Sequence, residues 1–178
     1  MKRVVVTGTS GSGKTTLARD IAARLNLPHT ELDTFQHEPN WQEAPREVFR
    51  ARVDAVTSGD GWVVDGNYSK ARDLVWPRAD TLIWLDYPPR IFMWRLFWRT
   101  LKRIVTREDL WGTGNRETFR KQFLTRESLF VWAWNSSKRR KTTYPQAFAL
   151  PEHAHLTIHH FTSPRQTQDF LETLKGDS

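Results

Sequence analysis

Residues 4–25 read VVVTGTSGSGKTTLARDIAARL: three valines lead into a glycine-rich loop, and the loop leads into a segment typical of a helix. Gly8, Gly11 and Gly13 carry no Cβ, so the loop can turn several backbone N–H groups toward one point. A helix that begins near Lys14 would direct the positive end of its dipole at the same point. The stretch therefore predicts a strand, an anion-binding loop and a helix, in that order.

The loop also fits a sequence motif. Residues 8–15, GTSGSGKT, match Gly, any four residues, Gly-Lys and then Ser or Thr, the pattern of the phosphate loop (P-loop) of nucleotide-binding proteins. In such a loop Lys14 would reach the β- and γ-phosphates of ATP, and the Thr15 hydroxyl would bind Mg²⁺. The predicted nucleotide-binding residues are Gly8, Thr9, Ser10, Gly11, Ser12, Gly13, Lys14, Thr15 and Thr16.

Short apolar segments alternate with segments of helical character along the rest of the chain. Strands are expected at 3–7, 29–32, 62–65, 81–86 and 155–161, and helices at 14–25 and 45–57, after Pro89 and after Pro164. Such alternation is typical of a parallel sheet covered by helices on both faces. The sequence thus predicts an α/β, three-layer P-loop NTPase fold with about five parallel strands and a helical lid.

The composition favours one intracellular domain. A chain of 178 residues is about the size of a single domain, so residues 1–178 are expected to fold as one unit. The absence of cysteine excludes disulfides and thiolate metal sites and fits a reducing compartment. The N-terminal apolar run is too short for a signal peptide or a membrane span. We expect a cytoplasmic protein with no membrane partner.

Two carboxylates are candidates for supporting the metal ion. Asp65 and Asp86 each end an expected strand, where a P-loop protein places the carboxylate that holds Mg²⁺. Gly66 follows Asp65 and allows a close approach of the backbone to phosphates, whereas Asp86 could simply cap the next helix. Asp65 is the favoured candidate, and its alternative role is an Asp-Gly turn at the strand end.

Asp33 follows the second expected strand, and ligands of open α/β sheets bind at the carboxyl ends of the strands. There it could orient or deprotonate the hydroxyl group of a phosphoryl acceptor. The alternative is that Asp33 and Thr34 only form a turn.

Arginines recur on the helix expected after Pro89. Arg95, Arg99 and Arg103 are spaced four residues apart and share one face, while another face carries the apolar side chains of Ile91, Trp94, Trp98, Leu101 and Val105. Aligned like charges repel one another unless an anion lies across them, and a triphosphate is such an anion. Residues 106–141, which include Gly112, Gly114 and Arg116, are expected to form a lid and a basic helical segment.

The net charge of +7 comes from one part of the chain. Residues 90–141 hold 14 Lys and Arg against 4 Asp and Glu, and five of the nine tryptophans. Basic and aromatic residues together can bind nucleic acid or an anionic substrate. They can equally form a helical face with solvated arginines over a Trp-rich core.

The motifs in their order resemble those of the adenylate-kinase-like group of P-loop kinases. GTSGSGKTTLA, WVVDGNYSKARD and ADTLIWLDYPPRIFMWRLFWR follow one another as the corresponding segments do in that group. The combination of ELD, DGNYS, GNRE and KRRK is more closely similar to small bacterial proteins known as adenylate-kinase-related or DNA topology modulation proteins. The resemblance implies ATP binding by residues 8–16, a Walker-B-type role for Asp65, and lid roles for Arg95 or Arg99 and for Arg116.

The acceptor side departs from that of adenylate kinases. Those enzymes follow the Asp-Gly with an aromatic residue, a proline and an arginine that binds the acceptor nucleotide, whereas Asn67, Tyr68 and Ser69 stand here. Asp33 is instead similar to the acid of shikimate- and gluconate-type kinases. Residues 34–57 are expected to form the acceptor side, with Trp41 and Tyr68 as walls; Trp41 could equally be a loop anchor.

The leading hypothesis is a kinase that transfers the γ-phosphoryl group of ATP to a small molecule: a nucleotide, a nucleoside or another hydroxyl compound. Its predicted catalytic residues are Lys14, Asp33, Arg95, Arg99 and Arg116, and its predicted metal-binding residues are Thr15 and Asp65. The alternative hypothesis is a nucleotide-dependent, nucleic-acid-binding ATPase, in which the basic segment 90–141 grips a polymer.

Overall fold

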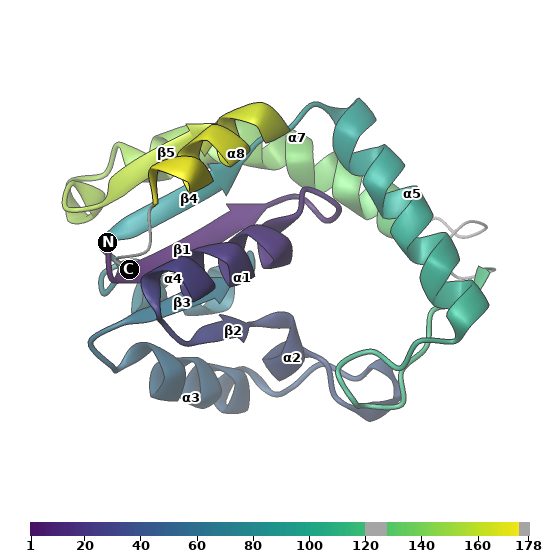
Figure 1. Ribbon diagram of the computed structural model, residues 1–178. Helices are drawn as coiled ribbons and strands as arrows, with labels where there is room; N and C mark the ends of the chain where they lie inside the picture. The colour runs from purple at the N-terminus through teal and green to yellow at the C-terminus, as the bar shows by residue number, and fades with distance from the viewer. Residues whose placement is uncertain (120–127, 175–178) are drawn as a thin grey trace.

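The computed structural model describes residues 1–119 and 128–174, and its centre is a five-stranded parallel sheet. The strands are β1 (Arg3–Gly8), β2 (His29–Glu31), β3 (Trp62–Asp65), β4 (Thr81–Leu85) and β5 (Thr157–Phe161). They lie in the order β2-β3-β1-β4-β5, and every neighbouring pair is parallel (Figure 1). β1 is central because its valines are buried on both faces, which matches its unbroken apolar run.

Helices cover both faces of the sheet. They are α1 (Lys14–Leu25), α2 (Asp33–Gln36), α3 (Arg46–Thr57), α4 (Arg72–Val75), α5 (Pro89–Thr106), α7 (Leu129–Phe148) and α8 (Pro164–Thr173), with short 3-10 turns at Pro39–Trp41, Ser69–Ala71 and Pro151–His153. Phe49 of α3 and Tyr144 of α7 pack with Val5 on one face, and Ile21 of α1 and Leu171 of α8 pack with Val6 on the other. The predicted three-layer α/β fold is confirmed.

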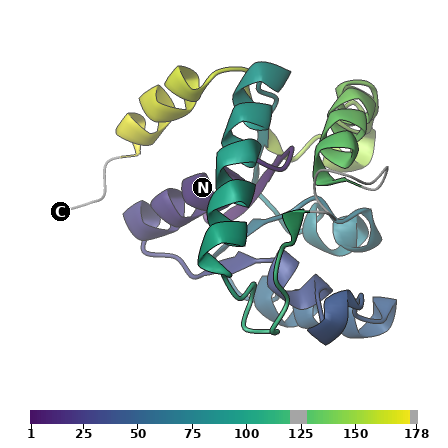
Figure 2. The same cartoon turned by 90° about the vertical axis from the view of Figure 1, so that its right-hand side faces the viewer.

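The structure describes only part of the lid and basic segment expected at 106–141. Residues 107–118 follow α5 as a loop, and α7 begins at Leu129, while residues 120–127 lie outside the described part of the chain. Figure 2 shows α5 standing across the carboxyl ends of the strands, with α7 beside it. Among the described helices, none is both long and apolar enough to cross a membrane.

For α5, the alternative of a Trp-rich core under solvated arginines is wrong, whereas the arginine face expected to meet an anion does line the cleft beside the phosphate loop. The buried side chains of α5 are Phe92, Leu96 and Thr100, while Trp94 and Trp98 are 63% and 50% exposed. Phe92 and Leu96 pack against Ala133 of α7, so a narrow stripe of apolar side chains joins α5 to α7. The tryptophans therefore do not form a core under solvated arginines. They lie outward, and the arginine face points toward the phosphate loop.

This orientation predicts different costs for two aromatic residues of α5. Phe92→Ala should lower the free energy of unfolding by about 3–5 kcal/mol because it empties a fully buried site. Trp94→Ala, two residues away, should change it by about 0.5 kcal/mol or less, because most of that ring is already in water. Denaturant titration measures both, and equal losses would contradict the orientation of the helix.

Candidate active site

The phosphate loop is held open by backbone geometry and by one side chain from the neighbouring strand end. Gly11 and Gly13 have φ values of 83° and 93°, in the left-handed region that favours glycine. Asn67, just past β3, binds Gly8 twice: its Oδ1 accepts the Gly8 N–H at 3.0 Å and its Nδ2 donates to the Gly8 carbonyl at 2.6 Å. Asn67 thus ties the start of the loop to the end of β3.

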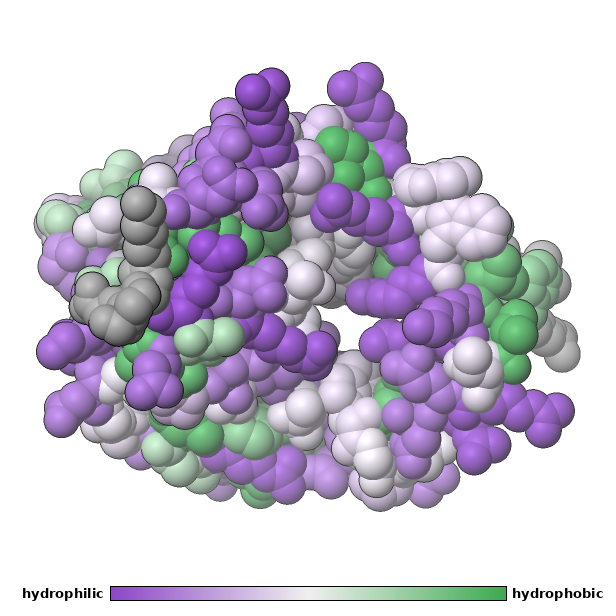
Figure 3. Space-filling model, viewed as in Figure 1, coloured by the Kyte–Doolittle hydropathy of each residue, from purple (hydrophilic) through white to green (hydrophobic). Residues whose placement is uncertain are grey.

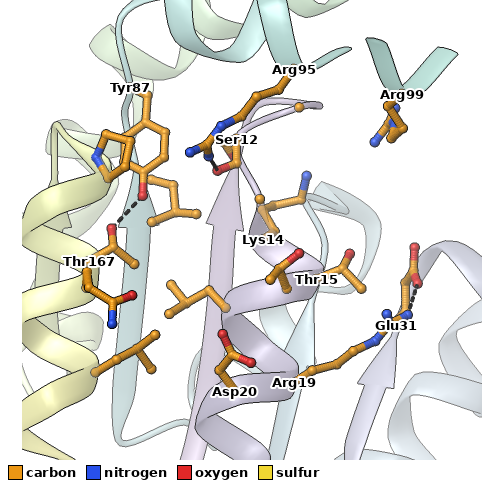
Figure 4. A pocket seen from close by; sticks show the side chains of 18 of the residues that line it. Ser12, Lys14, Thr15, Arg19, Asp20, Glu31, Tyr87, Arg95, Arg99 and Thr167 are labelled. Atoms are coloured by element: carbon orange, nitrogen blue, oxygen red, sulfur yellow. Dashed lines mark hydrogen bonds and ion pairs between the residues drawn. The ribbon is translucent and has the colours of Figure 1, made fainter. Parts of the chain in front are cut away.

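A cleft of about 800 Å³ opens between this loop, α5 and α8. Figure 3 shows the opening with hydrophilic side chains on both sides, and Figure 4 shows Arg95 and Arg99 pointing toward the loop from α5. Its lining residues come from the loop and α1 (Gly11–Leu17), from α5 (Arg95, Arg99, Lys102, Arg103) and from α8 (Pro164, Thr167, Gln168, Leu171). The cleft therefore extends from the phosphate loop to a less charged end beside α8.

Positive charge is concentrated where the loop and α5 meet. Arg95 Nη1 donates to the Ser12 carbonyl at 3.2 Å. Burial lowers the pKa of Lys14, and burial also lowers the pKa of Arg99. The charges of Asp33 and Asp65 act on Lys14 in the opposite direction and favour its charged form. A bound polyanion would relieve this accumulation of positive charge.

Thr15 and Asp65 lie together at the carboxyl end of β3. Thr15 Oγ1 donates to Asp65 Oδ2 at 2.8 Å, and His29 Nε2 lies 2.7 Å from the other carboxylate oxygen. Asp65 is buried, so these contacts fix its orientation. A hydroxyl and a carboxylate are hard oxygen ligands of the kind that Mg²⁺ takes, so the pair fits that ion.

The other candidate, Asp86, lies elsewhere. Its Oδ2 is 3.3 Å from His160 Nε2 and its Oδ1 is 3.9 Å from Lys141 Nζ, and it is not among the residues that line the cleft. It does not cap α5 either, because the N-cap position is Pro88 and no side chain caps that helix. Of the two acids, only Asp65 lies beside the phosphate loop.

Asp33 begins α2 and is oriented by Tyr68. The Tyr68 hydroxyl donates to Asp33 Oδ1 at 2.6 Å. Burial, followed by the charge of Asp33, raises the pKa of Tyr68 well above its ordinary value, so Tyr68 remains a donor. Asp33 does not line the cleft itself; Glu31 does, and burial together with the charges of Asp65 and Asp33 raises the pKa of Glu31.

Arg140 of α7 is a charged neighbour of the loop that the sequence predictions missed. It is only 6% exposed, its Nη1 donates to Thr9 Oγ1 at 3.2 Å, and burial lowers its pKa. The segment KRRK contains four cations and does not by itself say which one faces inward. The helical spacing of Ser136, Ser137 and Tyr144 around Arg140 could have indicated that Arg140 is the cation that faces inward. These residues share the buried face of α7.

The structure also places two other residues that the sequence singled out, Arg116 and Trp41. Arg116 is exposed and does not line the cleft, so the structure does not bring it to the phosphate loop. Trp41 belongs to an aromatic cluster with His37 and Trp111, whose rings stack at 4.6 Å. Trp111 follows α5, so this cluster joins the expected acceptor side to the lid segment.

Comparison with known proteins places the fold. No family model matches the chain, and no curated protein matches it in sequence. Among solved structures, shikimate kinase from Bacteroides thetaiotaomicron is 18% identical, with a TM-score of 0.56 over 97% of this chain and 96% of that one. A gluconokinase from Sinorhizobium meliloti 1021 is 16% identical, with a TM-score of 0.54 over 97% and 93%. Shikimate kinase from Acinetobacter baumannii in complex with shikimate is 13% identical, with a TM-score of 0.59 over 98% and 90%.

The chain has the P-loop kinase fold that these structures share. The closer resemblance to adenylate-kinase-related or DNA topology modulation proteins stays a prediction, because no sequence match supports it.

The geometry of the loop predicts the effect of adding one methyl group. A Cβ at Gly11 would overlap the Phe92 carbonyl of α5 and would sit on a backbone with positive φ. Gly11→Ala should therefore lower the free energy of unfolding by about 1–2 kcal/mol from the backbone conformation alone, and by more if α5 must shift. Gly59→Ala is the matched control, because a Cβ there meets nothing within 4 Å. Thermal unfolding of both variants tests this, and equal stability would contradict the close approach of α5.

Proposed function

We propose that this protein is an ATP-dependent kinase that transfers the γ-phosphoryl group to a hydroxyl group of a small molecule. The observation that carries the proposal is the position of Asp33: its charge acts on Lys14 of the phosphate loop, while Tyr68 fixes its carboxylate. A carboxylate near enough for its charge to act on the phosphate-binding lysine can orient an acceptor hydroxyl for in-line transfer.

The phosphate side of the reaction is assigned to the loop and to four cations. The loop N–H groups and Lys14 would bind the β- and γ-phosphates. Arg95, Arg99 and Arg140 surround the same point from α5 and α7, so they would stabilise the negative charge that spreads over the oxygens of the transferring group. These groups are already in place, so little reorganisation is required when the nucleotide binds.

Thr15 and Asp65 are assigned to the magnesium ion. Thr15 would bind it through the hydroxyl that now contacts Asp65, and Asp65 would hold it directly or through water. When bound, Mg²⁺ neutralises charge on the phosphate oxygens. His29 keeps Asp65 in one orientation and is a positioning residue for this site.

Asp33 is assigned to the acceptor. Because Tyr68 occupies Oδ1, Oδ2 is the oxygen available to accept the proton of the attacking hydroxyl group. As the new O–P bond forms, that proton passes to Asp33, and the bond from the γ-phosphorus to the β–γ bridging oxygen breaks. The names of the similar structures, shikimate kinase and gluconokinase, support a small-molecule acceptor.

The nucleic-acid alternative is less well supported. The arginines that would grip a polymer, Arg95, Arg99 and Arg103, line the nucleotide cleft instead. An ATPase that grips DNA would show an affinity that falls steeply with salt concentration, whereas the proposed kinase would have little affinity for DNA at physiological salt.

The decisive experiment measures ATP consumption with a panel of acceptors: nucleoside monophosphates, nucleosides, sugars and hydroxy acids. At least one acceptor should raise turnover above ATP hydrolysis in water. Lys14→Ala should lower that turnover by about 10²–10³-fold, and Asp33→Asn by about 10²–10⁴-fold with less effect on ATP binding. If no acceptor raised turnover while DNA did, the kinase proposal would be wrong.

The metal assignment makes a separate prediction. Asp65→Asn should raise the Mg²⁺ concentration needed for half-maximal activity by about 10-fold, because it removes a charged oxygen ligand. Asp86→Asn is the matched control at the end of the next strand and should leave the Mg²⁺ requirement within about twofold, since Asp86 does not face Thr15. Magnesium titration of both variants distinguishes the two acids.

A further inference from the structure

The loop after α5 is docked on the expected acceptor side of the molecule. Asn115 is 3% exposed, and both ends of its amide group are used. Its Oδ1 accepts the N–H of Trp41 at 2.9 Å, and its Nδ2 donates to the carbonyl of Glu38 at 2.9 Å. Figure 1 shows the loop after α5 lying beside the segment that follows α2, and Figure 2 shows the same two segments from the side. A buried amide with two backbone partners fixes the position of one segment against the other.

Trp111 makes a second contact between the same two segments. Its ring stacks on His37 with an interplanar angle of 16°, and it packs edge-on against Trp41. Trp41 and Trp111 both have positive φ values, of 59° and 58°, which is uncommon for residues other than glycine. The surrounding contacts must therefore compensate a backbone cost at both positions.

Two residues beyond Asn115, Glu117 connects this loop to the arginines of α5. Its side chain is only 4% exposed, and its Oε1 lies 3.4 Å from Arg103 Nη1. The charge of Arg99 also acts on the Glu117 carboxylate. Burial raises the pKa of Glu117, while Arg103 and Arg99 act against that rise. The carboxylate is therefore built into the arginine face rather than exposed on the surface.

The outer half of α5 has little else to hold it in place. Its buried residues are Phe92, Leu96 and Thr100, and no residue between Leu101 and Thr106 is buried. Val105 in that part is 74% exposed. Packing against α7 therefore fixes the inner half of the helix, and the contacts of the following loop fix the half that carries Arg103.

We propose that residues 107–117 form a strap that sets the position of the α5 arginines from the acceptor side, with Asn115 and Glu117 as its two positioning residues. Asn115 attaches the strap to the segment that contains Glu38 and Trp41, and Glu117 attaches it to Arg103. This inference rests on the proposed nucleotide site and extends it: a displacement of the acceptor-side segment is transmitted to the groups that face the phosphates.

A double-mutant cycle tests this coupling without knowledge of the acceptor. The readout is the dissociation constant of a non-hydrolysable ATP analogue, measured by calorimetry with Mg²⁺. Asn115→Ala and Glu117→Gln should each weaken analogue binding by about fivefold, because Arg103 loses its fixed position. In an Arg103→Ala background, Asn115→Ala should have no further effect, since the residue through which it acts is gone.

The controls separate positioning from general destabilisation. Asp54→Asn removes the carboxylate partner of Arg78, 2.7 Å away on the far side of the molecule, and should leave analogue affinity within about twofold of wild type. Thermal unfolding of every variant gives the fraction folded at the temperature of the binding measurement. A merely structural role for Asn115 would lower thermal stability equally in both backgrounds and would weaken binding equally in both.

The outcomes are distinct. Additive effects of Asn115→Ala and Arg103→Ala would overturn the strap, and so would unchanged or tighter binding by Asn115→Ala or Glu117→Gln. If the wild-type protein binds the analogue no better than Lys14→Ala does, the proposed nucleotide site and the strap proposal are both wrong. If the wild type binds the analogue and the effects of Asn115→Ala and Arg103→Ala are additive, only the strap proposal is wrong.

Discussion

Buried positive charge gathers around the phosphate loop, and much of the structure is arranged around it. Lys14, Arg99 and Arg140 are cations whose pKa values burial lowers, and they come from three different elements. Each costs free energy to bury, and each repels the others. Apolar packing of α1, α5 and α7, at some distance from the charges, offsets this free-energy cost. An anion bound at the phosphate loop would offset this cost.

The parts of the site that depend on local sequence could be predicted. The phosphate loop, the position of Asp65 at a strand end and the placement of Asp33 after the second strand all follow from motifs and from where parallel strands end. The structure brings Thr15 into contact with Asp65 and brings Asp33 into contact with Tyr68, 35 residues further along the chain. The strand ends place these residues on one edge of the sheet, and periodicity alone is enough to locate the strand ends.

The parts that depend on tertiary packing could not be predicted in the same way. The sequence of α5 offers an apolar face with two tryptophans and a narrower one with Phe92 and Leu96, and periodicity favours the first. The second is buried because it packs against Ala133 of α7, and this rotation of the helix directs the arginine face toward the phosphate loop. Arg140 and Asn115 were missed for a related reason: their partners, Thr9 and Trp41, are 131 and 74 residues distant. Contacts with residues far along the chain therefore decide which face of α5 is buried and which side chains reach the loop.

The position of the packing stripe on α5 also determines how far a tilt of the helix would move each of its arginines. Phe92 and Leu96 form a fulcrum near its start, and Arg103 lies seven residues beyond Leu96, which at helical rise is about 10 Å along the axis. A tilt of about 10° about that fulcrum would move the base of Arg103 by about 2 Å and the base of Arg95, close to the pivot, by far less. The position of Arg103 is thus far more sensitive to the tilt of the helix than the position of Arg95 is.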